Sequence, residues 1–485
     1  MNARAYKPIE TGHLPDTREL LHTGGDSRIL TVSGFNEYGC GPSPDSEIYT
    51  FGSSTASTIS PAGFAAADAL RQRLVAKPDA TVYDREFGRI RRELTSLCGL
   101  GDLDRLELLF TASGTDTHLI ASRLTGPDHI IMVEGAETGR GVATALAGRH
   151  FSTRSPYAEG LTAGEPLAGA APARLSEISI RTADGEPRGG QEIDDEIAKQ
   201  VSTLAKNGRR ILLVLVDVSK SGMIAPSPAC AADLKARFPQ FVDVLVDACQ
   251  FRMAPSTLKA YLECGFMVAL TGSKFLTGPT FSGALLIPGT VRRQKTPAGL
   301  TAYASRFEWP ERMRFGFSGI GVNFGLLLRW EAAMAELRTF RGIPDQQIKD
   351  FLKKFAAAIR RRLETDTNLE TLTVPIIRRL PDENGWDQLQ TIFPFRLRKN
   401  GIRLSVEETS RIHILLQKDL SSLSSHPVAA LRCSLGQPIS CGTGGSALRM
   451  CASARLAAEG QNHADRIILR AFSVFDKIDL LLDAL

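Results

Sequence analysis

Short apolar runs alternate with amphipathic helical patterns through the first two thirds of the chain. The runs that predict strands are residues 106–110, 129–134, 211–217, 242–247, 266–271 and 283–287. Elsewhere apolar side chains recur at spacings of three and four, as in residues 87–97, which predicts helices. This alternation predicts an α/β fold in which helices cover a largely parallel sheet and ligands bind at the carboxyl ends of its strands. Residues 155–190, rich in Ala, Gly and Pro, predict an irregular insertion.

The pattern changes at both ends of this region. Residues 1–55 are rich in Gly, Pro and Ser and predict an N-terminal arm, with loops at 38–42 and 51–54 that could reach a site. Residues 56–338 then form the predicted large domain. Helices and strand-like segments mix in the remainder, which predicts a smaller C-terminal α+β domain over residues 339–485.

Composition narrows the class of protein. The chain has 485 residues, 43% of them hydrophobic and 23% charged, which is typical of a soluble globular protein with two or three domains. Its net charge of +5 predicts no nucleic-acid partner, although it is compatible with small anionic ligands. No apolar run reaches the roughly 18 residues that predict a membrane span. Eight scattered cysteines without a C-x-x-C pair predict reduced thiols, a cytoplasmic location and no metal site.

Lys274 is the first candidate for chemistry. It follows the apolar run 266–271 and is preceded by Thr271, Gly272 and Ser273. A lysine amine can condense with an aldehyde, and small hydroxyl side chains can donate hydrogen bonds to phosphate oxygens. The segment therefore predicts a Schiff-base lysine beside a phosphate, with a surface lysine in a turn as the alternative.

Two further segments support this interpretation. Asp247 ends the run 242–247 and lies 27 positions before Lys274, so one strand–helix–strand passage would bring both to the same sheet edge. A carboxylate there can pair with a protonated pyridine nitrogen; an N-cap on the next helix is the alternative. Gly114 and Thr115 stand between an apolar run and a helical pattern, where backbone N–H groups at a helix start bind anions.

With these motifs the sequence resembles the pyridoxal-phosphate enzymes of fold type I, in the class V aminotransferase and cysteine desulfurase branch. The motifs are Ser113-Gly114-Thr115, Asp247-Ala248-Cys249-Gln250, Thr271-Gly272-Ser273-Lys274 and Gly278-Pro279. The resemblance covers residues 55–337, and residues 447–455 more weakly. It implies an α/β fold with a mainly parallel, seven-stranded type of sheet, a smaller C-terminal α+β domain, and pyridoxal 5'-phosphate as cofactor.

The resemblance also implies roles for individual residues. Lys274 would form the Schiff base and act as the catalytic residue, while Asp247 would pair with the pyridine nitrogen and Gln250 would lie near the phenolic oxygen. The implied phosphate contacts are Gly114, Thr115, Asp116, Thr271 and Ser273. Family members are homodimers in which a further phosphate contact crosses from the second subunit. Ser318 matches that position here, with an ordinary helix N-cap as the alternative.

The residues expected to bind the substrate match the family pattern less closely. Arg449 fits the arginine that binds the substrate's α-carboxylate, with a structural salt bridge as the alternative and Arg455 as a second candidate. Residues 133–139 lack the ring that many members place over the cofactor, so Glu137 or Thr138 would stand there. Lys220 occupies a position that often carries a cofactor-contacting asparagine, and we predict it as a substrate-binding residue.

These matches predict an enzyme that acts on an α-amino acid through the Lys274 Schiff base and a carbanion at Cα. Transferase chemistry is the leading expectation, either transamination or side-chain replacement, with a sulfonium amino acid such as S-adenosylmethionine as one donor. A lyase or cysteine desulfurase is the alternative. In the desulfurase case Cys433, 16 residues before Arg449, would carry sulfur; otherwise it is a packed thiol. A non-catalytic protein that kept the fold is a further alternative.

Overall fold

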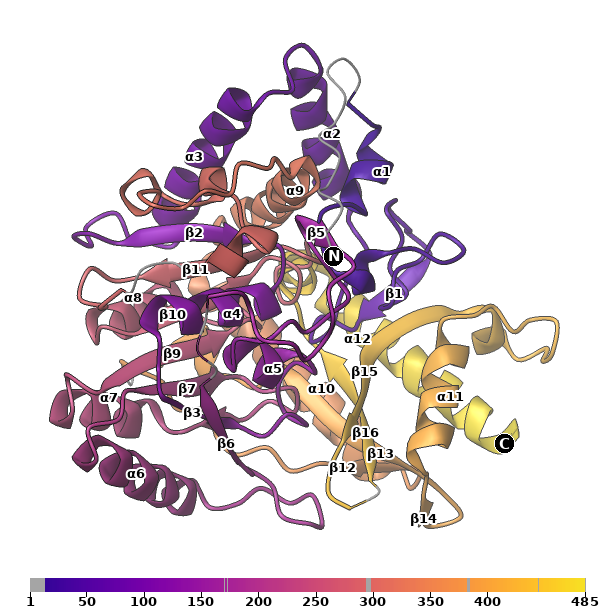
Figure 1. Cartoon of the computed structure of the whole chain (residues 1–485). Helices are drawn as coiled ribbons and strands as arrows, with labels where there is room; N and C mark the ends of the chain where they lie inside the picture. Colours follow the sequence, from indigo (N-terminus) through magenta and orange to yellow (C-terminus); the bar gives the residue numbers. More distant parts are fainter. Residues whose placement is uncertain are drawn as a thin grey trace.

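The computed structural model describes residues 14–169, 171, 173–293, 298–381, 384–443 and 445–484, and it contains two large β-sheets (Figure 1). The larger sheet has the order β2-β11-β10-β9-β7-β3-β6, and β8 pairs with β7. Its strands are β2 (Glu107–Thr111), β3 (His129–Val133), β6 (Arg174–Ile178), β7 (Ile211–Asp217), β8 (Ile224–Ala225), β9 (Val242–Ala248), β10 (Met267–Thr271) and β11 (Gly283–Ile287).

The central strands of this sheet are parallel, as predicted. Strands β6, β3, β7, β9 and β10 run in one direction, while β11 is antiparallel to both β10 and β2. Every residue of β7, β10 and β11 is buried. Strands covered on both faces have continuous apolar sequences, which is why these runs show no polar alternation.

Helices cover both faces of the larger sheet and continue into the C-terminal part (Figure 1). The helices are α1 (Thr17–Leu21), α2 (Pro61–Val75), α3 (Ala80–Leu97), α4 (Gly114–Thr125), α5 (Val142–Leu146), α6 (Gly190–Lys206), α7 (Pro228–Arg237), α8 (Pro255–Glu263), α9 (Phe324–Arg341), α10 (Asp345–Thr365), α11 (Val406–Leu416) and α12 (Ala454–Ala484). None of the described helices has both the length and the apolar character needed to cross a lipid bilayer.

The smaller sheet belongs mainly to the C-terminal part, in the order β1-β15-β16-β13-β12 with β14 paired to β13. Its strands are β1 (Ile48–Phe51), β12 (Leu369–Thr371), β13 (Ile392–Lys399), β14 (Ile402–Arg403), β15 (Arg432–Ser440) and β16 (Ser446–Cys451). Strand β1 comes from the predicted N-terminal arm and pairs in parallel with β15. The arm is therefore joined to the smaller sheet by backbone hydrogen bonds.

One sequence expectation, the irregular insertion, needs adjustment. The stretch 155–190, expected to be irregular, contains the end of a short ribbon of β4 (Arg154–Ser155) and β5 (Ala158–Glu159), and also β6. Strand β6 was missed because Arg174–Ile178 mixes charged and apolar residues at a sheet edge, where only one residue of the five is buried. The predicted domain boundary after residue 338 falls inside the last turn of α9.

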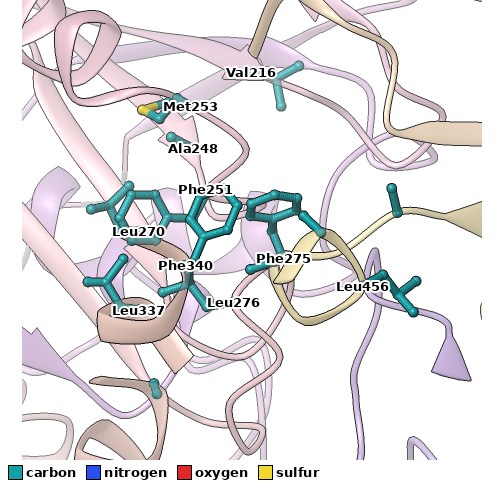
Figure 2. Packing of buried hydrophobic residues seen from close by; sticks show 14 of the residues in the cluster. Val216, Ala248, Phe251, Met253, Leu270, Phe275, Leu276, Leu337, Phe340 and Leu456 are labelled. Atoms are coloured by element: carbon teal, nitrogen blue, oxygen red, sulfur yellow. The ribbon is translucent and has the colours of Figure 1, made fainter. Parts of the chain in front are cut away.

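A buried aromatic cluster joins the larger sheet to the C-terminal part (Figure 2). Phe275 stacks on Trp386 with ring centroids 5.6 Å apart and meets Phe340 of α9 edge-on at 5.3 Å. The Phe275 N–H donates to the Gln250 carbonyl at 3.3 Å, and the Ala454 N–H donates to the Phe275 carbonyl at 2.9 Å. The turn after β10 is thereby fixed to the turn after β9 and to the start of α12.

Truncation of Leu276, which is buried in this cluster, should therefore be costly. We expect Leu276→Ala to lower the free energy of unfolding by about 2–5 kcal/mol, because it removes buried methyl groups and leaves a cavity. Leu423, which is 79% exposed, offers the matched control, and Leu423→Ala should change stability by less than about 0.5 kcal/mol. Denaturant unfolding of both variants measures the difference. If both variants lost the same stability, the residues around Leu276 would not form a tightly packed core (Figure 2).

Candidate active site

A cavity of about 680 Å³ lies at the carboxyl ends of β9 and β10, beside the first turn of α4. Its lining brings together Lys274, Asp247, Gly114, Thr115, Thr271, Ser273, Lys220 and Arg449, eight residues singled out in the sequence. The loops of the N-terminal arm also reach it, through Tyr38 and Ser54. Residues from six separate parts of the chain therefore share one chamber at the sheet edge where α/β folds bind ligands.

The turn that carries Lys274 is held by the sheet and by α9. The Gly272 N–H donates to the Ser282 carbonyl at 2.8 Å, and the Gly278 N–H donates to the Gly272 carbonyl at 2.9 Å. A Cβ atom on either glycine would lie within 2.7 Å of Ala333 Cβ in α9, so only glycine allows this approach. The lysine thus stands on a rigid turn, with Phe275 buried directly behind it.

Asp247 lies at the end of β9 and is buried together with His118. One oxygen of its carboxylate accepts the Cys249 N–H at 3.2 Å, and the other lies 3.2 Å from His118 Nε2. Burial alone would raise the pKa of Asp247, but His118 and Lys274 outweigh it and hold the pKa below its usual range. Burial likewise opposes a charge on His118, yet the Asp247 carboxylate raises the pKa of the imidazole. The aspartate is therefore kept ionised inside the cavity.

Helix α4 starts at the same end of the cavity. Ser113 is its N-cap, and the Ser113 hydroxyl accepts the Asp116 N–H at 3.2 Å. The remaining N–H groups of a first helical turn have no partner within the helix, which makes Gly114 and Thr115 suitable for a phosphate. A Cβ atom on Gly114 would lie 2.7 Å from Cys249 Sγ, so the glycine keeps this approach open.

Cys249 lies close to two other residues that could bind a metal ion. The candidate ligand atoms of His118, Asp247 and Cys249 lie within 4.8 Å of one another. However, burial and the nearby Asp247 raise the pKa of the Cys249 thiol well above its usual range, and a protonated thiol is a poor metal ligand. Since His118 and Asp247 also pair with each other, the group fits a lining for an organic ligand better than a metal site.

Arg449 lies on β16 and points its guanidinium toward the cavity, where it is 2% exposed. It donates to the Gln437 carbonyl at 2.6 Å, to the Thr55 hydroxyl at 2.9 Å and to the Lys220 carbonyl at 3.2 Å. Its Nε has no partner, and it forms no ion pair within the described part of the chain. A buried guanidinium without a carboxylate suits an anionic ligand better than the structural salt bridge considered above.

Of the cofactor contacts predicted within one subunit, three lie outside the lining of the cavity. The Gln250 amide donates to the Ser54 carbonyl at 3.0 Å and accepts from Arg252. The Asp116 carboxylate contacts the Ser113 hydroxyl, and the Thr138 hydroxyl faces the Glu134 carbonyl at 3.5 Å. Contacts of these side chains with a cofactor stay predictions.

Other predicted residues have clear structural partners. Glu137, considered for the place over the cofactor, is instead buried 2.9 Å from Arg181 and bound by the hydroxyls of Ser219 and Ser221. Arg455, the second carboxylate-binding candidate, pairs with Glu336 at 2.8 Å and donates to backbone carbonyls. Both serve the scaffold, which corrects those two expectations.

Sequence reasoning missed two residues of the lining. His118 follows Gly114 by one helical turn, and its Nδ1 lies 2.6 Å from the Gly114 carbonyl, so the spacing of four carried a usable signal. Arg28 comes from the N-terminal arm, pairs with Asp26 and reaches Thr115 at 3.4 Å. No local pattern marks Arg28, because its place depends on how the arm packs.

Comparison with known proteins identifies the fold. No protein-family model matches the chain, and no curated protein matches its sequence. The fold is nevertheless the α/β fold type I of pyridoxal-phosphate enzymes, which confirms the fold predicted above.

The chain is similar in structure to a NifS-like protein from Rickettsia africae, with 12% identity, a TM-score of 0.56, and coverage of 89% of this chain and 99% of that one. It is also similar to a structure of SPT with a PLP internal aldimine (13% identity, TM-score 0.51, coverage 90% and 88%). Oryza sativa TDC with PLP and tryptamine gives 13% identity, a TM-score of 0.50, and coverage of 90% and 83%. At these identities the likeness shows a shared fold.

The buried carboxyl of Asp116 makes stability depend on pH. Burial, and then the neighbouring Asp26, raise the pKa of Asp116 to about 7. The folded protein therefore binds more protons than the unfolded chain between about pH 4 and pH 7, and this group costs stability as the pH rises through that window. We expect Asp116→Asn to remove this cost, on the order of a few kcal/mol above pH 7.

Thermal unfolding at pH 5 and pH 8 measures this effect. Relative to the wild type, Asp116→Asn should gain stability at pH 8 and much less at pH 5. Asp104, which is exposed, provides the control, and Asp104→Asn should keep the pH response of the wild type. An Asp116→Asn protein whose pH response equals that of the wild type would contradict the assignment.

Proposed function

We propose that the protein is a pyridoxal 5'-phosphate-dependent enzyme that acts on an α-amino acid. One observation carries the proposal: an amine, an ionised aspartate and a helix start, on Lys274, Asp247 and Gly114, line a single cavity. These are the three groups that an aldehyde, a pyridine nitrogen and a phosphate require. The shared fold of neighbours solved with PLP supports the same assignment.

Each group has a distinct task in this proposal. Bound pyridoxal phosphate supplies an electron sink that stabilises negative charge at the amino acid's Cα. The Asp247 carboxylate, whose pKa His118 and Lys274 hold low, would pair with a protonated ring nitrogen. The Lys274 amine would hold the aldehyde and would be the base that moves the proton at Cα. Arg449 orients the substrate through its α-carboxylate.

Assembly as a homodimer is part of the proposal. The N-cap of α9 is Asn323, whose side-chain oxygen accepts the Leu326 N–H at 2.9 Å, so Ser318 does not serve as the N-cap considered for it. Ser318 is exposed, and the apolar side chains Phe315 and Ile320 beside it are 100% and 72% exposed. Exposed apolar side chains around one turn support a contact with a second subunit. Ser318 would then reach the partner's phosphate.

The proposed reaction class is transfer, by transamination or by replacement on the side chain. A sulfonium donor such as S-adenosylmethionine fits the cavity poorly, because Lys220 and Arg449 line it and form no ion pair with the described residues. These cations would repel a positively charged side chain. A lyase shares the same first steps and is the runner-up.

The free thiols of all eight cysteines support a cytoplasmic location.

The sulfur-carrying role considered for Cys433 has no support. Cys433 lies in β15 and is fully buried, and its thiol donates to the Leu416 carbonyl at 3.4 Å. Burial raises the pKa of the thiol to about 12. A thiol that stays protonated and out of contact with the cavity cannot attack a substrate sulfur there.

The position of the covalent bond tests the proposal. Borohydride reduction of the protein loaded with pyridoxal phosphate fixes the cofactor on the amine that binds it. Peptide mass spectrometry is expected to find it on Lys274, and Lys274→Ala should lower amino-acid turnover by about 100- to 10,000-fold. Lys353 is exposed on α10, so Lys353→Ala should be labelled and active like the wild type. A label on Lys220, or no label on loaded protein, would overturn the proposal.

A second test concerns the thiol in β15. We expect Cys433→Ser to change amino-acid turnover by less than about twofold, because the side chain is buried away from the cavity. Steady-state assays against a panel of amino acids, with mass spectrometry for persulfide sulfur, measure this. A loss above tenfold in a folded variant, or a persulfide on Cys433, would restore the desulfurase alternative.

A further inference from the structure

Five cationic side chains besides histidine line the cavity, and their partners differ. Arg28 is bound to Asp26, and the exposed Arg140 lies 3.7 Å from Glu37. The others are Lys220, Lys274 and Arg449, which form no ion pair with the described residues. In the proposed function Lys274 binds the aldehyde and Arg449 binds the α-carboxylate. Lys220 is then a cation without an assigned anion.

The loop around Lys220 is built to hold this lysine in place. The Lys220 N–H donates to the Glu137 carbonyl at 2.9 Å, and the Glu137 carboxylate accepts the Ser221 N–H at 3.0 Å and the Ser219 hydroxyl at 2.8 Å. Val218 has a φ of +65°, a strained conformation for a β-branched residue. A buried acid and a strained backbone therefore fix the loop from which Lys220 enters the cavity.

The half-buried Lys220 lines the same cavity as the buried Arg449, and its backbone carbonyl accepts from Arg449 at 3.2 Å. The Lys220 Nζ donates to the backbone carbonyls of Ala136 at 3.2 Å and Gly135 at 3.4 Å. Burial, together with the charges of Arg449 and Lys274, lowers the pKa of Lys220 to about 8. At neutral pH most of the lysine remains charged. Two cations that share a buried cavity repel each other, and an anion between them relieves this cost.

We propose that Lys220 binds an acidic group on the side chain of the substrate, so that the substrates are α-amino acids with a carboxylate, sulfonate or phosphate on the side chain. Arg449 binds the α-carboxylate, and Lys220 selects the second anion. This inference rests on the proposed function and adds its substrate class. Lys220 then determines specificity and does not carry out the chemical step.

Binding of substrate analogues to the cofactor-loaded enzyme tests the inference without measuring turnover. Butyrate and succinate have four carbons each and differ in the second carboxylate; 3-sulfopropanoate and 3-phosphonopropanoate replace that group with a sulfonate or a phosphonate. Calorimetry should show at least one dianion binding about 10-fold or more tightly than butyrate. Lys220→Gln should reduce this preference to about twofold and leave butyrate binding within threefold, because only the second anion loses its partner.

Two variants separate the possible causes. Lys353→Gln removes an exposed lysine on α10 and should keep the preference of the wild type. Arg449→Gln should weaken butyrate and the dianions alike. Loaded enzyme that shows no dianion preference, or a Lys220→Gln variant that keeps it, would overturn the inference and leave the proposed function standing. Absence of borohydride label on Lys274 would instead overturn the proposed function, and this inference with it.

Discussion

The burial of Phe275 is the constraint on which the rest of the structure depends. Its ring packs against both Trp386 and Phe340, and its backbone is hydrogen-bonded to Gln250 and to Ala454. Lys274 immediately precedes it, so the backbone at Lys274 cannot move without disturbing this core. One buried ring therefore sets the lysine turn relative to the aspartate turn and to the start of α12, which follows β16 and its Arg449. A backbone held in this way presents the reactive side chain from a fixed point in the cavity wall.

The electrostatics of the cavity follow from that placement. Asp247 and His118 face each other at 3.2 Å in the lining of the cavity, and each shifts the pKa of the other toward its charged form. Lys220 and Arg449 lie along the wall formed by the loop after β7 and by the C-terminal part. This division gives the cavity one end suited to a ring nitrogen and another suited to anions. The N-terminal arm completes the chamber through Arg28 and Tyr38, which explains why its strand β1 is joined to the smaller sheet.

Much of this arrangement could be predicted from the sequence. The apolar runs gave β7 and β11 with their observed ends, because strands buried on both faces have no competing pattern. Lys274, Asp247 and Gly114 could be placed together because the carboxyl ends of parallel strands meet at one edge. These predictions needed only local patterns and the order of the strands.

The remainder depended on contacts between distant parts of the chain. Glu137 lies in a segment that suggested a place over the cofactor, yet its carboxylate is taken by Arg181, 44 residues away. Arg28 enters the cavity only because the arm folds back over α4, and β6 forms only because β3 offers an edge. The periodicity of the sequence does not predict such contacts, because they form only when distant parts of the chain pack against each other.

A crystal structure of the protein with pyridoxal phosphate tests the central claim most directly. The account predicts continuous density from Lys274 Nζ to the ring, the ring nitrogen about 2.7–3.2 Å from the Asp247 carboxylate, and the phosphate at the first turn of α4. A cofactor joined to Lys220, or a ring nitrogen facing away from Asp247, would contradict it.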